Sequence, residues 1–409
     1  MAHVLHDSEL TREQRAVVEL RPERHYLITG PPGSGKTQVL FHRARWLARS
    51  LQIPDNAFSV LVYTNVLTYF LRQAIDFLGI PAQNVRTFDD LCAELWDKHV
   101  CLPRPLRRAS PRTRPSIDFR AIRDGVLDRL DSPGPRSAPP LTFVMVDEGQ
   151  DLDATAYAIL RLVARHITVF ADSRQQIFEG GAGIPEILSH LGIPGQSASL
   201  LSAHRNSPDI AKLASYFGTA YEGINYLAMD RQKPCLYIAR DWADEIDHLA
   251  DVLRERRLLN HRCGIIVPSN RDLHDIAEKL EQRGNEVHKA ISVLKGGTPP
   301  DFNSLVPVIA SYHSAKGLTF DTVLLPRLVD RHFPRIGGPS IRQRLLLVGI
   351  TRATQWAYLS TVSGHEMPEI AQLHTAATQG DLFLKTYSSP GQSTPSAPPP
   401  DSENDVGFL

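Results

Sequence analysis

The segment Gly30–Thr37 constrains the fold of this chain more than any other stretch, since it reads Gly-Pro-Pro-Gly-Ser-Gly-Lys-Thr. It follows a short apolar strand predicted at residues 25–29 and precedes residues 38–47, whose apolar side chains recur at helical spacing. Strand, glycine-rich loop and helix in this order form the context of a phosphate-binding loop. An ordinary turn is the alternative, but every fixed position of the motif is filled in the required context.

The residue types of this loop indicate the ligand that it can hold. Its glycines let the backbone turn N–H groups toward a phosphate chain, and the start of the next helix adds a positive dipole end. Lys36 is expected to reach the β- and γ-phosphates of a bound nucleotide, and the Thr37 hydroxyl to bind Mg²⁺. The nucleotide-binding residues predicted in this segment are Gly30, Gly33, Ser34, Gly35, Lys36, Thr37 and Gln38.

A second feature is the apolar strand predicted at residues 141–146, which ends in Asp147-Glu148-Gly149-Gln150-Asp151. Two adjacent carboxylates at the end of a buried strand are costly unless positive charge lies beside them. Mg²⁺ bound by Asp147 accounts for one of them, and Glu148 acting as the base on an attacking water accounts for the other. A plain turn at the strand end is the alternative.

Strands alternate with helices along the chain, which predicts an α/β fold with parallel sheets. In the first half we expect further strands at 59–64, 85–88 and 166–171, and helices at 10–18, 65–77 and 89–98. In the second half we expect strands near 236–239, 264–267, 306–309, 322–325 and 356–359, and helices at 243–256 and 271–283. A chain of 409 residues is long enough for two or three domains.

The charge balance gives no sign of a nucleic-acid partner, because Lys plus Arg and Asp plus Glu both number 45. Any basic surface must therefore be local. Prolines alternate with arginines in residues 102–116, and this proline-arginine segment is either a solvated loop or an arm that binds phosphates or a partner. Its arginines are Arg104, Arg107, Arg108, Arg112 and Arg114.

The cellular setting follows from what the sequence lacks. The four cysteines form no Cys-x-x-Cys pair, which argues against a zinc site or a disulfide framework and favours a reducing, cytoplasmic setting. The N-terminus has no signal-peptide pattern, and no apolar run is long enough to span a bilayer. The Ser, Pro, Gly and Asp composition of residues 388–409 predicts a disordered tail.

Short motifs follow one another over most of residues 10–360. They are Gln14, Gly30–Thr37, Asp147–Asp151, Asp172–Phe178, Arg205, His313–Leu318 and Val348–Ala353. In number and order they resemble the UvrD/Rep-like helicases of superfamily 1. The resemblance implies two RecA-like P-loop domains with ATP and Mg²⁺ in the cleft between them. It places domain 1 at 1–199, with a reduced insertion at 102–140, and domain 2 at 200–387.

The resemblance also implies roles for residues beyond the P-loop. Gln14 would read the adenine, although a solvated helix residue is the alternative. Gln175 would sense the γ-phosphate, and Arg205 and Arg352 would reach across to the transferring phosphoryl group, with surface ion pairs as the alternative. The candidates for single-strand contacts are Tyr63, Thr64, Phe88 and His313. For the two aromatic residues, ordinary core packing is the alternative.

The chain departs from the family pattern at four positions. His204 stands where the family usually has a tyrosine that stacks on the adenine, so an imidazole would take that place in the nucleotide site. Gly180 replaces a DNA-stacking tryptophan, Asp89 replaces a histidine beside the DNA, and Thr319 replaces a glutamate. These changes affect the expected DNA-binding surface more than the expected ATP site.

The sequence thus predicts an ATP hydrolase of the UvrD-like DNA helicase type, which moves on single-stranded nucleic acid with DNA as the expected strand. The spacing of the motifs leaves no room for the large second insertion of the family, so duplex separation is expected to need a partner. The alternative is a nucleic-acid-regulated ATPase subunit that switches a partner, such as a nuclease in a DNA repair or phage-defence complex.

Overall fold

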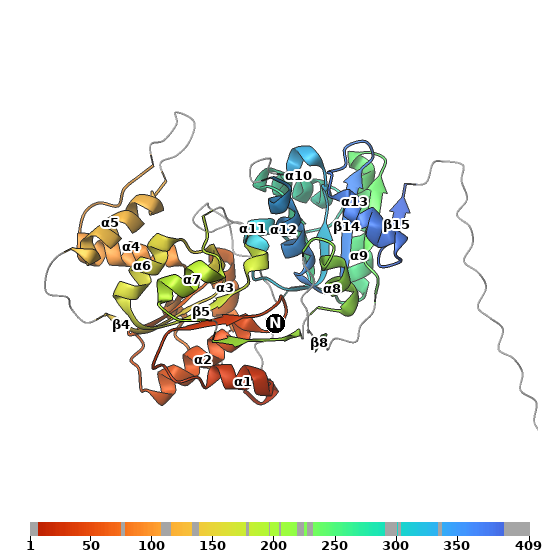
Figure 1. The fold of residues 1–409 in the computed structure, drawn as a ribbon. Helices are drawn as coiled ribbons and strands as arrows, with labels where there is room; N and C mark the ends of the chain where they lie inside the picture. The colour runs from red at the N-terminus through yellow and green to blue at the C-terminus, as the bar shows by residue number, and fades with distance from the viewer. Residues whose placement is uncertain are drawn as a thin grey trace, which may run out of the picture.

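A computed structural model shows two α/β units, each built on a parallel β-sheet (Figure 1). The structure describes residues 7–74, 78–107, 116–132, 139–176, 180–195, 197–203, 206–218, 225–226, 232–290, 301, 304–333 and 338–387. The predicted tail and residues 108–115 of the proline-arginine segment lie outside these ranges. Within them, no helix is both long enough and apolar enough to cross a membrane.

The first unit has a six-stranded sheet in the order β3-β2-β4-β5-β1-β6, with every pairing parallel. Its strands are β1 (Tyr26–Thr29), β2 (Phe58–Leu61), β3 (Val85–Arg86), β4 (Leu141–Val146), β5 (Ala164–Ala171) and β6 (Ala198–Ser199). Its helices are α1 (Arg12–Val18), α2 (Lys36–Ser50), α3 (Asn65–Ala74), α4 (Phe88–Leu95), α5 (Phe119–Asp131), α6 (Ala154–Val163) and α7 (Ile184–Leu191). The carboxyl ends of parallel strands lie at one edge of a sheet, where ligands commonly bind.

Helices cover both faces of this sheet. Successive side chains of a strand point to opposite faces, so a strand whose residues are nearly all apolar needs cover on both sides. In β1, Ile28 belongs to the same core cluster as Val39 and Leu40 of α2. Its neighbour Leu27 belongs to a second cluster with Tyr157 of α6. The near-continuous apolar strands of the sequence are therefore those of a sheet buried on both sides.

The second unit has a seven-stranded parallel sheet in the order β11-β12-β10-β13-β14-β9-β15. Its strands are β9 (Cys235–Ala239), β10 (Cys263–Val267), β11 (His288–Lys289), β12 (Val308–Ser311), β13 (Phe320–Leu325), β14 (Ala353–Val362) and β15 (Phe383–Thr386). Its helices are α8 (Pro208–Ala214), α9 (Trp242–Leu258), α10 (Asn270–Glu281), α11 (Tyr312–Ala315), α12 (Gly338–Ile350) and α13 (Ile370–Thr378). The short strands β7 (Ser202–Ala203) and β8 (Asn225–Tyr226) pair with each other.

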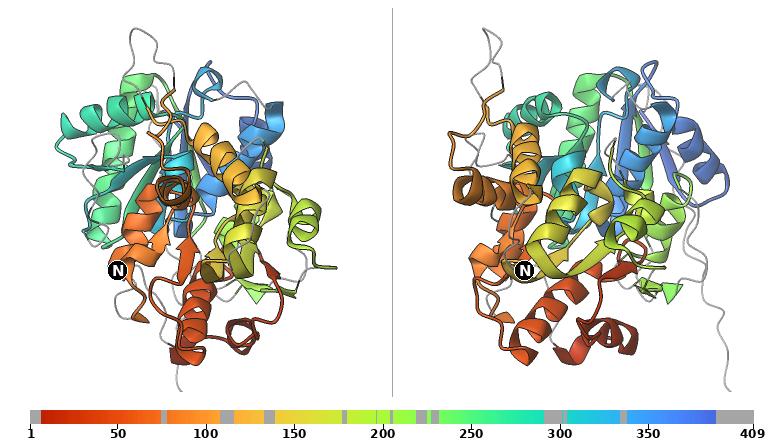
Figure 2. Two further views of the ribbon diagram at one scale, coloured as in Figure 1. Left: turned by 90° about the vertical axis from the view of Figure 1, so that its left-hand side faces the viewer. Right: turned by 60° about the vertical axis from the view of Figure 1, so that its left-hand side comes forward.

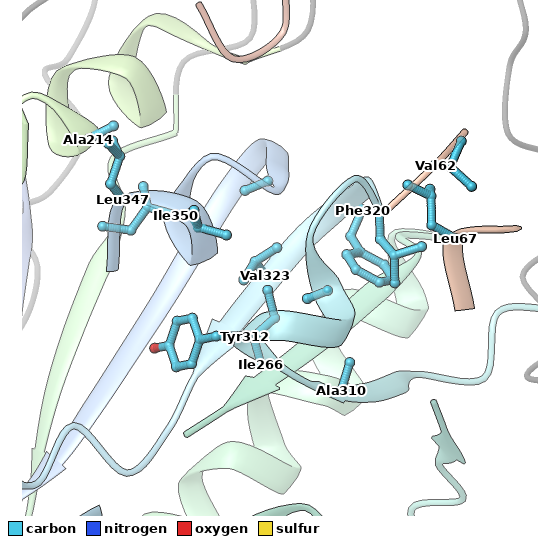
Figure 3. Packing of buried hydrophobic residues seen from close by; sticks show 14 of the residues in the cluster. Val62, Leu67, Ala214, Ile266, Ala310, Tyr312, Phe320, Val323, Leu347 and Ile350 are labelled. Carbon is cyan, nitrogen blue, oxygen red and sulfur yellow. The ribbon is translucent and has the colours of Figure 1, made fainter. Parts of the chain in front are cut away.

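The two units contact each other, and Figure 2 shows the same fold from two further sides. One apolar cluster runs through both of them, and in Figure 3 Val62 and Leu67 of the first unit lie beside Phe320 of the second. Gly317 has a left-handed backbone (φ +83°), and a Cβ there would lie 2.5 Å from a methyl carbon of Leu67. Only glycine therefore fits where the segment after α11 meets α3.

The predicted α/β class is confirmed, while several strand boundaries differ from the prediction, and for three of them the structure shows the reason. Strand β2 ends at Leu61, because the Thr64 hydroxyl accepts a hydrogen bond from Leu67 N and α3 begins at once. Strand β3 ends before Thr87, which caps α4, so that Phe88 is helical. Strand β12 starts at Val308, two residues later than predicted, since Pro307 has no N–H group for the sheet.

Candidate active site

The glycine-rich loop joins β1 to the N-terminus of α2. Gly33 and Gly35 have left-handed backbone conformations, with φ of +81° and +84°, which glycine adopts without strain. Gly35 is the N-cap of α2, so the first N–H groups of the helix have no partner within it. A Cβ on Gly30 would lie 2.7 Å from Ser34 Oγ and 2.8 Å from the carbonyl of Leu200. The loop is thus tightly curled at a helix end that favours anions.

Gln14 links α1 to this loop. Its side chain is 2 % exposed, and its Nε2 donates a hydrogen bond to the carbonyl of Ser34 at 3.2 Å. Its Oε1 accepts from Thr11 N while Thr11 Oγ1 accepts from Gln14 N, which forms a capping box at the start of α1. The interpretation of Gln14 as a solvated helix residue is therefore wrong. Its role at the adenine stays a prediction.

Lys36, the first residue of α2, points back onto the loop. Its Nζ donates to the carbonyls of Gly30 at 2.7 Å and Pro31 at 2.9 Å. Ser34 Oγ is buried and has no hydrogen-bond partner among the described residues. An orphaned hydroxyl and a lysine at a curled helix N-terminus fit a phosphate chain, which would accept hydrogen bonds from both. Gln38 follows in α2 and is half-buried.

Thr37 and Asp147 bring together the oxygen atoms of the predicted metal site. Thr37 Oγ1 donates to Asp147 Oδ2 at 2.9 Å, although the two residues are far apart in the sequence. Hydroxyl and carboxylate oxygens are ligands that Mg²⁺ accepts alongside substrate phosphates. Burial raises the pKa of Asp147, and the neighbouring Glu148 carboxylate raises it further. A cation at this position would offset both effects.

Glu148 is the candidate base, and it is 7 % exposed. Its backbone is left-handed (φ +53°), a conformation that is uncommon outside glycine and is often found at functional sites. Burial would raise its pKa, but the positive charges of Lys316, Lys36 and Arg352 lower it. Gln150 Nε2 also donates to its Oε2 at 2.6 Å. Glu148 is therefore held ionised, as a base must be.

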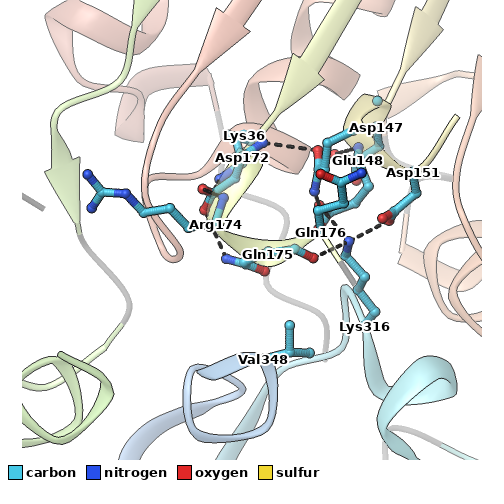
Figure 4. A network of polar contacts seen from close by, with 12 residues as sticks. Lys36, Asp147, Glu148, Asp151, Asp172, Arg174, Gln175, Gln176, Lys316 and Val348 are labelled. Atoms are coloured by element: carbon cyan, nitrogen blue, oxygen red, sulfur yellow. Dashed lines mark hydrogen bonds and ion pairs between the residues drawn. The ribbon is translucent and has the colours of Figure 1, made fainter. Parts of the chain in front are cut away.

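Lys316 of the second unit provides the positive charge nearest to Glu148 (Figure 4). Its side chain is fully buried, its Nζ lies 3.4 Å from Glu148 Oε2, and it forms an ion pair with Asp151. It also donates to the carbonyl of Gln175 at 2.9 Å. Burial would lower its pKa, but the two carboxylates raise it. In the sequence this lysine is part of the motif His313–Leu318, but the motif alone predicts no ion pair with the first unit.

Arg352 and Gln175 form a second contact between the units. Arg352 is 2 % exposed, and its Nη2 donates to Gln175 Oε1 at 2.9 Å. Gln175 Nε2 in turn donates to Asp172 Oδ2 at 3.1 Å, and that carboxylate lies 4.0 Å from Lys36 Nζ. The two residues predicted to act at the γ-phosphate therefore touch each other, close to the P-loop lysine.

The remaining predicted site residues are not all brought together. His204 and Arg205 lie outside the described residues. Tyr63 and Phe88 line one cavity of about 450 Å³ at the carboxyl ends of β2 and β4. Phe88 itself is 5 % exposed and lies under the guanidinium of Arg123.

Thr64 and His313 do not line that cavity. Thr64 instead accepts a hydrogen bond at the start of α3. His313 lies in α11, where burial first and Lys316 second lower its pKa. Of the four candidates for single-strand contacts, two therefore line this cavity and two do not.

Two family models match the chain. The model of an AAA domain matches residues 13–181, and the model of the UvrD-like helicase C-terminal domain matches residues 271–364. Together they span the P-loop, the acidic strand end, Lys316 and Arg352. The comparison with curated proteins found no match.

Among solved structures, the chain is similar to the C-terminal domain of a possible DNA helicase from Lactobacillus plantarum WCFS1. The sequence identity is 19% and the TM-score is 0.35, and the match covers 44% of this chain and 98% of that one. The two family models, matched in this order around one interdomain site, identify the chain as a member of the UvrD-like helicases, with two RecA-like units.

Proposed function

We propose that this chain is an ATP-dependent translocase or helicase that moves on single-stranded nucleic acid, with DNA as the expected strand. The observation that carries the proposal is the interdomain contact of Lys316 with Glu148 and of Arg352 with Gln175. We also propose the domain limits 1–199 and 200–387. With these limits, each of the two contacts joins one residue of the first domain to one residue of the second.

ATP and Mg²⁺ are the proposed nucleotide and metal, and ATP supplies the phosphoryl group that is transferred. The loop from Gly30 to Thr37 would hold the phosphates, and Thr37 with Asp147 would hold the metal. Lys36 would exchange its two loop carbonyls for phosphate oxygens. Glu148 would take the proton of the attacking water, and its lowered pKa keeps the carboxylate ready to do so.

The second domain would complete the site. The positive charge of Arg352 can neutralise the negative charge that develops on the transferring phosphoryl group. Gln175, which accepts a hydrogen bond from Arg352, would hold the guanidinium in position. Arg205 is proposed as a second arginine of this kind. Because these arginines belong to the second domain, the hydrolysis rate would depend on the position of that domain relative to the P-loop. A strand bound across both domains could therefore change the rate.

The test is the ATP hydrolysis rate of the purified chain with and without single-stranded DNA or RNA, followed by a translocation assay on labelled strands. We expect single strands to stimulate hydrolysis and the protein to move along them. Hydrolysis that neither DNA nor RNA changes would contradict the proposal.

A second candidate function is an ATPase subunit that switches a partner protein. Leu102 and Leu106, in the proline-arginine segment, are 62% and 59% exposed, which favours contact with another protein. Movement of the isolated chain along single strands separates the two candidates. A chain that hydrolyses ATP with single strands but does not move along them would favour the partner-switching subunit.

A further inference from the structure

The cavity beside Tyr63 contains two charged side chains, Asp89 and Arg123, that the candidate ATP site does not use. It measures about 450 Å³ and lies at the carboxyl ends of β2 and β4, next to the acidic strand end. Four carboxylates line it together with a single arginine, Arg123 of α5, and no lysine is among its lining residues. The carboxylates are Asp89, Asp147, Asp151 and Asp153, of which Asp147 belongs to the candidate metal site. An acidic cavity of this kind repels phosphate groups and suits a ligand that presents N–H donors.

Arg123 is fixed in one orientation. Its Nε and Nη2 donate to Asp89 Oδ1 at 3.0 Å and 2.7 Å, and its Nη1 lies 3.4 Å from Asp153 Oδ2. Its Cζ lies over the buried ring of Phe88, 5.2 Å from the ring centroid, and the Arg123 side chain is 26% exposed and lines the cavity. A guanidinium plane held in this way is a surface on which a nucleobase can stack.

Asp89 adds a hydrogen-bond acceptor at the edge of this plane. Both bonds from Arg123 end on its Oδ1, and within the described ranges no hydrogen bond reaches its Oδ2. Both carboxylate oxygens of Asp153 have partners. Its Oδ1 caps α6 by accepting a hydrogen bond from Ala156 N at 2.8 Å, and its Oδ2 accepts from Arg123. Asp151 is engaged with Lys316. Asp89 Oδ2 is therefore a carboxylate oxygen of this cavity that can accept a hydrogen bond from a ligand, because the Asp89 side chain is 33% exposed whereas that of Asp151 is fully buried.

We propose that Asp89 and Arg123 form a nucleobase site in which a base stacks on the guanidinium and donates its exocyclic amino group to Asp89 Oδ2. This inference rests on the proposed function, since it concerns the strand that the helicase binds. Cytosine, adenine and guanine carry such an amino group. Thymine and uracil present carbonyl oxygens instead, which a carboxylate repels. The site therefore selects bases that carry an amino group, and Asp89 determines this preference.

The test compares the binding of two 15-nucleotide strands, oligo-deoxycytidine and oligo-deoxyuridine, by fluorescence anisotropy at pH 8. Cytosine carries an amino group where uracil carries a carbonyl oxygen. Uracil is used in place of thymine because thymine has an additional methyl group. One hydrogen bond to a charged acceptor predicts about tenfold tighter binding of the cytidine strand. In Asp89→Asn this ratio should fall to about one, because an amide can both accept and donate.

Asp153→Asn is the matched control, since it removes the same charge from the same cavity and contacts the same arginine. Asparagine also keeps the helix cap of α6. The control should retain the tenfold ratio. Arg123→Lys keeps the positive charge but loses the planar surface, so it should weaken the binding of both strands and leave the ratio in place. Circular dichroism of each variant shows whether it is folded.

Three results would overturn the inference. The wild-type protein could bind both strands equally, or Asp89→Asn could keep the ratio. Alternatively, both asparagine variants could tighten the binding of the two strands to the same extent, which would mean that the carboxylates only repel phosphates. A wild-type protein that binds neither strand would instead refute the proposed function, and the inference with it.

Discussion

Replacing Lys316 with methionine removes the buried cation between the two domains and keeps a side chain of similar length. The side chains of Lys316 and Asp151 are both 0% exposed, and Glu148 lies 3.4 Å from the same nitrogen. The substitution leaves the Asp151 carboxylate buried without its ion-pair partner. Breaking a buried pair in this way costs about 3–5 kcal/mol. We expect the free energy of unfolding of Lys316→Met to fall by that amount.

The measurement is urea unfolding followed by circular dichroism, with Lys279→Met as the control. Lys279 pairs with Asp275 at 2.8 Å, but the two side chains are 37% and 41% exposed. A surface pair of this kind contributes about 1 kcal/mol or less, so the control should change little. The same chemical substitution is thus compared at a buried and at an exposed ion pair.

A double variant tests the reason for the loss. Adding Asp151→Asn to Lys316→Met removes the buried charge as well as its partner, so it should recover part of the lost stability. The reasoning would be refuted if Lys316→Met cost no more than the control. It would also be refuted if the two substitutions simply added their separate costs.

Three further predictions concern the proposed function. Lys36→Ala and Glu148→Gln should both abolish turnover, but only the first should weaken ATP binding, and equal losses of affinity would contradict this division. Arg352→Ala should lower the catalytic rate by about 10³ with little change in ATP affinity, whereas near-normal turnover would make this arginine structural. Replacing the five arginines of residues 102–116 should weaken single-strand binding and reduce its salt dependence, and an unchanged salt slope would favour a plain loop or a protein target.

The sequence by itself determined the local architecture of the candidate ATP site. The strand, glycine-rich loop and helix around Gly30–Thr37, and the acidic end of β4, depend on residues that are neighbours in the chain. Parallel strands then place their carboxyl ends at one edge, so the meeting of Thr37 and Asp147 follows from the predicted fold class. These features could be predicted because propensity, spacing and turn chemistry act over a few residues.

Only the tertiary structure decided which side chains from distant segments share a buried space. Lys316 and Asp151 are 165 positions apart, and no spacing rule relates them. Nor did any pattern indicate that Arg123 would lie over Phe88 and bond to Asp89 at the lining of one cavity. Such contacts are set by how helices and domains pack, because a buried charge is stable only where packing supplies its partner.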